Sequence, residues 1–278
     1  MYKILKKRNL TENAAEYVVH APLAAKRCMP GQFVILIVEE GGERIPLTIA
    51  DYDRERGTIT LLVQAAGYST ARLAQKKEGD FIKDFLGPLG NATDLTEFRS
   101  VLLAAGGIGS AVVLPQAKYL KQNTSVLTDV VLGGRNASFL TYEEELRTFS
   151  DRLFVVTDDG SKGEKGFVTD VIKRLVDGGK KYDAVFAVGP MPMMRAVAEL
   201  TRKYGIKTIV SMNTIMVDGT GMCGGCRLTV GGEIKHACVD GPEFDGHLVN
   251  FEEAMNRAAF YRETEKEHLC RLQNEKKE

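Results

Sequence analysis

The chain has 278 residues, and its 37 Lys and Arg balance 37 Asp and Glu, so its formal net charge is zero. This balance offers no field that would attract nucleic acid or an anionic membrane, and no stretch approaches the roughly 18 apolar residues of a membrane helix. The basic N-terminus has no apolar run after it, which predicts a cytoplasmic protein without a signal peptide, and the length predicts about two domains.

The first part of the chain, residues 1–97, is typical of a β-rich domain. Apolar and β-branched runs bounded by Gly and charged turns occur at 31–40, 57–64 and 77–90. Several short strands at this spacing predict a small antiparallel barrel.

Residues 98–212 show a different pattern, in which apolar runs alternate with helical spacing. Strands are predicted near 100–107, 128–134, 153–157, 184–188 and 207–211, and helices near 110–122, 142–148, 167–177 and 191–204. This alternation predicts an open parallel sheet with crossover helices.

The regular pattern stops after Ser211, and residues 213–278 contain a glycine-rich cysteine segment followed by a predicted helix over 250–273. Asn250 is the expected N-cap of this helix, and Glu253, three residues later, suggests a capping box. The last residues, 274–278, are expected to be frayed.

Glycine turns follow several of the predicted parallel strands. Their amides favour a pyrophosphate, although the full G-x-G-x-x-G pattern is absent and a tight turn that binds nothing stays an alternative. Because the carboxyl ends of parallel strands meet at one edge, these turns predict one elongated nucleotide site. Its candidate residues are Gly106, Gly107, Ile108, Gly109, Gly134, Arg135, Asp158, Asp159, Gly189, Pro190 and Met191.

Two carboxylates within this set bear on the choice of nucleotide. Asp158 and Asp159 can accept hydrogen bonds from a ribose diol and would repel a 2′-phosphate, which favours NAD(H). Arg135 could hold that phosphate, so NADP(H) stays an alternative.

Three of the five cysteines lie in the C-terminal segment. Cys223 and Cys226 form a C-x-x-C pair, and Cys238 follows after eleven intervening residues. Structural zinc and [2Fe–2S] clusters both require four ligands, and the spacing alone does not separate them. The fourth ligand is Asp218, five residues before Cys223, or His236, which would complete a zinc site.

Four motifs in this order resemble the ferredoxin–NADP reductase superfamily: R-I-P-L-T at 44–48, G-x-S-T at 67–70, A-G-G-I-G at 105–109 and V-G-P-M at 188–191. Within it, the chain is similar to the electron-transfer subunit group. That group includes the dihydroorotate dehydrogenase electron-transfer subunit and the small subunit of NADH-dependent reduced ferredoxin:NADP oxidoreductase, also described as a sulfide dehydrogenase subunit.

The resemblance implies that the barrel binds FAD, with the Thr48 hydroxyl near the reactive flavin nitrogen and no catalytic acid–base residue. Two positions depart from the superfamily pattern, in which an aromatic residue precedes the hydroxyl and an arginine lies three residues before it. Leu47 replaces the aromatic residue, and Arg44 lies four residues before Thr48. The implied FAD residues are Arg44, Ile45, Pro46, Leu47, Thr48, Leu62, Val63, Gln64, Gly67, Ser69 and Thr70.

The resemblance also implies a [2Fe–2S] cluster held by Asp218, Cys223, Cys226 and Cys238. In the dihydroorotate dehydrogenase subunit the pattern is C-x4-C-x2-C, and here Asp218 occupies the first cysteine position, which favours the ferredoxin:NADP oxidoreductase subunit. That assignment implies a larger flavin and iron–sulfur partner subunit, with NADH, NADPH and ferredoxin as reactants and electron bifurcation as a further implication. The alternatives are a dihydroorotate dehydrogenase subunit and a zinc-stabilised nucleotide-binding module without redox activity.

Overall fold

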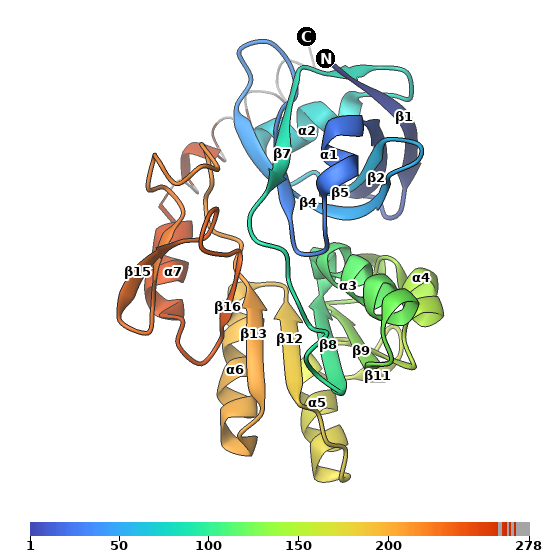
Figure 1. The fold of residues 1–278 in the computed structure, drawn as a ribbon, viewed down its shortest axis with the longest axis vertical. Helices are drawn as coiled ribbons and strands as arrows, with labels where there is room; N and C mark the ends of the chain where they lie inside the picture. Colours follow the sequence, from blue (N-terminus) through green and yellow to red (C-terminus); the bar gives the residue numbers. More distant parts are fainter. Residues whose placement is uncertain (261–262, 266, 268–269, 271–278) are drawn as a thin grey trace.

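The computed structural model describes residues 1–260, 263–265, 267 and 270. Its N-terminal part is a seven-stranded antiparallel sheet of order β6-β1-β2-β5-β4-β3-β7 that curls into a nearly closed barrel (Figure 1). The strands are β1 (Tyr2–Asn9), β2 (Ala14–His20), β3 (Phe33–Ile37), β4 (Arg44–Asp53), β5 (Thr58–Gln64), β6 (Phe81–Ile82) and β7 (Asp84–Leu89), with helices α1 (Pro22–Arg27) and α2 (Tyr68–Gln75).

The single strand predicted over 77–90 is divided into β6 and β7. The break at Lys83 lets β6 pair with β1 while β7 pairs with β3, so one short run of chain serves both edges of the sheet. Closing a barrel in this way removes exposed strand edges.

The second part is a mostly parallel sheet of order β11-β10-β9-β8-β12-β13-β16. It contains β8 (Ser100–Gly106), β9 (Leu127–Gly134), β10 (Arg152–Thr157), β11 (Glu164–Lys165), β12 (Ala184–Val188) and β13 (Lys207–Ser211), with helices α3 (Ser110–Asn123), α4 (Glu143–Phe149), α5 (Val168–Asp177) and α6 (Met191–Tyr204). Short 3₁₀ turns, η1 (Gly107–Gly109) and η2 (Ala137–Phe139), follow β8 and β9. The predicted barrel and parallel sheet are both confirmed.

Alternation along the strands places helices on both faces of this sheet. In β8, Val101, Leu103 and Ala105 pack in one core with α3 and α4. The residues between them, Leu102 and Ala104, pack in a second core with α5 and α6. Both faces of the sheet are therefore buried, as expected for parallel strands joined by crossover helices.

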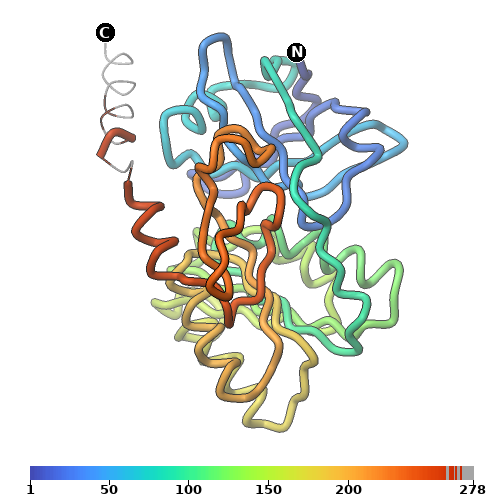
Figure 2. The backbone as a smooth tube through the Cα atoms, turned by 60° about the vertical axis from the view of Figure 1, so that its left-hand side comes forward, coloured from blue at the N-terminus to red at the C-terminus, as the bar shows by residue number. Residues whose placement is uncertain are grey.

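The C-terminal segment forms the hairpin β14 (Arg227–Val230) and β15 (Glu233–His236), the short strand β16 (Glu243–Asp245) and helix α7 (Phe251–Ala258). β16 completes the edge of the parallel sheet by pairing antiparallel with β13. Figure 2 shows this segment, orange to red, running alongside both the barrel and the α/β half.

Asn250 caps α7 as predicted, since its side chain accepts from Glu253 N. The reciprocal half of the capping box differs from the prediction, because the Glu253 carboxylate accepts from Thr229 N while Asn250 N donates to Thr229 O. Most of the helix predicted beyond Phe260, and the predicted frayed end at 274–278, lie outside the described residues.

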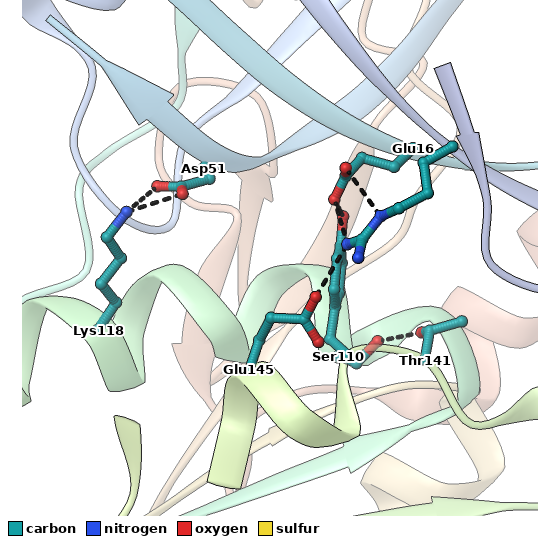
Figure 3. A network of polar contacts seen from close by, with 8 residues as sticks. Glu16, Asp51, Ser110, Lys118, Thr141 and Glu145 are labelled. Carbon is teal, nitrogen blue, oxygen red and sulfur yellow. Dashed lines mark hydrogen bonds and ion pairs between the residues drawn. The ribbon is translucent and has the colours of Figure 1, made fainter. Parts of the chain in front are cut away.

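Side-chain contacts join the barrel to the α/β half (Figure 3). Lys118 of α3 donates to both carboxylate oxygens of Asp51, at 2.8 and 2.7 Å. Arg8 of β1 bonds Glu16 at 3.0 Å and Glu145 of α4 at 2.8 Å. Among the helices of the described residues, none is long and apolar enough to cross a bilayer.

Candidate functional site

The predicted nucleotide turns meet at one edge of the sheet, because β10, β9, β8 and β12 are parallel neighbours. Glycine is required where these ends crowd together: a Cβ added at Gly109 would overlap the Val188 carbonyl oxygen. Gly107 has φ +56° and open space beside it, while Ile108 is partly exposed. This edge therefore presents accessible backbone at the start of α3, as a pyrophosphate site needs.

Arg135, Asp158 and Asp159 lie together at the ends of β9 and β10, and all three are exposed. Asp158 N donates to Gly134 O at 3.0 Å, and Asp159 N donates to Arg135 O at 3.3 Å. Hydrogen bonds from Ser161 lower the pKa of Asp159 below its usual value. A negatively charged carboxylate therefore stands at this end of the nucleotide edge.

A cavity of about 70 Å³ lies where the barrel meets this edge. Gln64, a predicted flavin residue, and Ile108, a predicted nucleotide residue, line it together with parts of the chain that were not predicted. These are residues 11–14 at the start of β2, Ser138 and Phe139 of η2, and Thr141. Turn residues of this kind carry no sequence signal for a site, because their position depends on how the two halves pack.

The strand predicted to hold the flavin is β4, which lies between β3 and β5. Ile45 and Leu47 pack against the barrel core. Since side chains alternate along a strand, Arg44, Pro46 and Thr48 lie on its other face. In β5, Leu62 packs towards the α/β half and Val63 into the barrel core.

The N-terminus of α2 brings Gly67, Ser69 and Thr70 together, as the G-x-S-T motif predicts. Thr70 Oγ1 accepts from Ala66 N at 3.0 Å and from Gly67 N at 2.9 Å. The Ser69 hydroxyl donates to the Glu43 carboxylate. A carboxylate of the protein thus takes the Ser69 hydroxyl that was predicted to hold the FAD pyrophosphate, and a bound pyrophosphate would have to replace it there.

Asp218, Cys223 and Cys226 lie in the loop between β13 and β14 (residues 212–226, the cluster loop), and Cys238 follows β15. Cys226 and Cys238 are buried with their sulfur atoms 3.2 Å apart, whereas Cys223 is exposed. Hydrogen bonds from the Gly225 and Asp218 backbone amides lower the pKa of Cys223, while burial raises that of Cys238 to about 12. Thr220 and the Met222 amide donate to Asp218 Oδ2, which lowers the pKa of that carboxyl.

As they stand in the described residues, no three His, Cys, Asp or Glu side chains converge tightly enough to hold a single metal ion. His236, the alternative zinc ligand, has its Nδ1 3.9 Å from an Asp240 oxygen. A donor set of three thiols and one carboxylate, with amides aimed at sulfur, fits an iron–sulfur cluster, which is larger than one ion.

The cluster loop rests directly on the barrel. Gly219 has φ +84°, and a Cβ added there would lie 2.6 Å from Ile35 Cδ1 and 2.8 Å from Leu89 Cδ1. Arg44, predicted among the flavin residues, donates to the backbone carbonyls of Val217 and Asp218, at 2.6 and 3.0 Å. The structure therefore brings Arg44 to the cluster loop.

Comparisons with known proteins agree with this arrangement. The model for the iron–sulfur cluster binding domain of dihydroorotate dehydrogenase B matches residues 213–250. A Clostridium beijerinckii protein described as uncharacterized, from the adh 3′ region, is 51% identical, covering 95% of this chain and 92% of its own length. A Thermotoga maritima homolog of the dihydroorotate dehydrogenase B (NAD(+)) electron-transfer subunit is 47% identical, covering 95% and 93%.

A solved structure extends the likeness to three dimensions. It is a chain from a study of flavin-based electron bifurcation by NADH-dependent reduced ferredoxin–NADP oxidoreductase. The two chains superpose with a TM-score of 0.91 at 44% identity, covering 98% of each. The similarity thus includes the barrel, the parallel sheet and the cluster segment.

Proposed function

The chain belongs to the family of dihydroorotate dehydrogenase B electron-transfer subunits and their homologs, and we propose that it carries FAD, a [2Fe–2S] cluster and an NAD(H) site. It is an oxidoreductase subunit of this family. FAD, when bound, takes two electrons from NADH as a hydride, and the cluster carries electrons one at a time.

The observation that supports this proposal best is the packing of the cluster loop against the barrel. Gly219 packs against Ile35 of β3, and Ile35 pairs with Pro46 of β4. Neighbouring strands are about 4.8 Å apart. The proposed cluster ligands therefore lie next to the strand that neighbours the proposed flavin strand, as transfer of electrons between two centres requires.

The nucleotide edge supplies binding and orientation. Backbone amides at 106–109 would hold the pyrophosphate, and the carboxylates of Asp158 and Asp159 would accept from the adenosine ribose. The barrel residues Thr48 and Gln64 would face the ring system bound between the two halves. No acid–base pair is needed, because the transferred group is a hydride.

A partner subunit completes the proposal. The chain would pass electrons to a larger flavin and iron–sulfur subunit in a complex that couples NADH, NADPH and ferredoxin by electron bifurcation. Asp218 supports this assignment over a dihydroorotate dehydrogenase complex, because it occupies a cysteine position of that subunit's pattern. Within the described residues no cysteine forms a disulfide, which supports a cytoplasmic location, where thiols stay reduced.

Anaerobic purification followed by an optical spectrum and metal analysis tests the proposal. We expect flavin bands, broad iron–sulfur absorption, and stoichiometric FAD, iron and acid-labile sulfide. A colourless protein with stoichiometric zinc would instead support a nucleotide-binding module without redox activity.

A further inference from the structure

One side chain connects the proposed flavin strand with the proposed cluster loop. Arg44 begins β4, and its guanidinium reaches 173 and 174 residues along the chain to two consecutive carbonyls. Nε donates to Val217 O at 2.6 Å, and a terminal nitrogen donates to Asp218 O at 3.0 Å. Two donors of one planar fork thus hold two successive peptide groups, which fixes their orientation more tightly than a single bond.

The direction of these carbonyls decides where the adjoining amides point. In a trans peptide the C=O and N–H lie in one plane and point in opposite directions. The Val217 carbonyl faces Arg44, so the Asp218 N–H faces away from Arg44. On the same loop, Gly225 N donates to the Cys223 sulfur at 3.4 Å.

The charge of Arg44 also acts on this loop. Its guanidinium lies 3.0 Å from the backbone carbonyl oxygen of Asp218, a proposed cluster ligand. Adding an electron to a cluster adds negative charge. A nearby cation and N–H donors aimed at sulfur therefore stabilise the reduced form and raise the reduction potential.

The one-residue offset noted in the sequence explains why Arg44 is available for this contact. An arginine three residues before Thr48 would stand at Ile45, whose side chain packs with the barrel core. Arg44 is four residues before Thr48, and strand alternation places it on the opposite face from Ile45. The shift by one residue thus turns the guanidinium towards the cluster loop.

We propose that Arg44 is a positioning residue for the iron–sulfur cluster: it fixes the backbone at Val217 and Asp218, beside a proposed ligand, and its positive charge there raises the cluster's reduction potential. This inference rests on the proposed function, in which Asp218, Cys223, Cys226 and Cys238 hold the cluster.

The test compares Arg44→Gln and Arg44→Lys with the wild-type chain in its holo complex. The control is Arg54→Gln, which removes a guanidinium that follows β4 but donates to Cys28 O instead of the loop. FAD, iron and sulfide are quantified, and the cluster midpoint potential is measured by a redox titration followed by electron paramagnetic resonance.

We expect Arg44→Gln to retain FAD and to lower the equilibrium constant for cluster reduction about tenfold or more, a fall of about 59 mV for a one-electron couple. Arg44→Lys keeps the charge and should recover part of this fall, while Arg54→Gln should match wild type. Loss of iron from Arg44→Gln alone, with FAD retained, would also support the positioning role.

Two results would overturn the inference. One is an unchanged potential and spectrum in Arg44→Gln. The other is loss of FAD with the cluster unaltered, which would show that Arg44 holds FAD and does not position the cluster. A wild-type chain without iron would count against the proposed function itself, so the two failures are distinguishable.

Discussion

Replacing Glu243 with Gln should change how the stability of the protein depends on pH. The Glu243 carboxyl lies where β16 pairs with β13, and Ser211 Oγ donates to it at 3.0 Å. Burial raises its pKa from 4.5 to about 8, while the Thr93 and Ser211 hydroxyls oppose this only in part. Gln is close in size and still accepts from Ser211, but it cannot ionise.

The sign follows from which state holds the proton. Below pH 4.5 both states are protonated, and between pH 4.5 and 8 the unfolded carboxyl ionises while the folded one stays neutral. The contribution of Glu243 to the free energy of unfolding is therefore fully present below pH 4.5 and is lost as pH rises towards 8. The upper limit of this loss in unfolding free energy is about 5 kcal/mol, since each unit of pKa difference corresponds to about 1.4 kcal/mol. Since part of the Glu243 side chain is accessible to solvent, we expect on the order of 2 kcal/mol after screening.

Urea unfolding of the FAD-loaded chain at several pH values between 5 and 8 measures this effect. The free energy of unfolding of wild type, minus that of Glu243→Gln, should fall as pH rises. The exposed carboxylate variant Glu97→Gln serves as the matched control and should follow wild type. A wild-type minus Glu243→Gln difference that stays constant across this range would refute the reasoning.

Three further predictions concern the cluster and the nucleotide edge. Asp218→Ala should lose or destabilise the cluster while FAD stays bound, and unchanged iron content and spectrum would show that the carboxylate is no ligand. Replacing Asp158 and Asp159 together with Ala should raise the ratio of kcat/KM for NADPH over NADH about tenfold, because two charges that repel a 2′-phosphate are gone; an unaltered ratio would count against their role. Gly109→Ala should destabilise the α/β half by about 1–3 kcal/mol, since its Cβ meets backbone, and an unchanged Tm would contradict this.

Local patterns were enough to predict most of the fold. The strands and helices over 100–211 follow from apolar runs that alternate with helical spacing, because a parallel sheet buries both faces of its strands. β16 escaped prediction, since three residues, Glu243–Asp245, carry no periodicity. Its pairing with β13 depends on the path of the cluster segment through space.

The candidate site was predictable where its parts are close in sequence. The cluster loop and each glycine turn are formed by residues close together in the chain, so motif spacing identifies them. The contact of Arg44 with the cluster loop was not predictable, because it depends on the packing of two segments more than 170 residues apart. The same is true of the β1–β2 turn at the cavity.

The cluster segment does more than carry ligands, because it also joins the two larger parts of the molecule. β16 continues the parallel sheet, while Asn91, which follows the barrel's last strand, donates from its backbone N to Gly241 O at 2.7 Å. Cys226 and Cys238 share one buried core with Phe33 and Ile35 of the barrel. By contrast, partly exposed ion pairs such as Lys118–Asp51 contribute only about 0–1 kcal/mol each. The segment that carries the cluster ligands therefore also joins the proposed flavin and nucleotide sites, in addition to the buried core that Ala50 and Leu62 of the barrel share with α3.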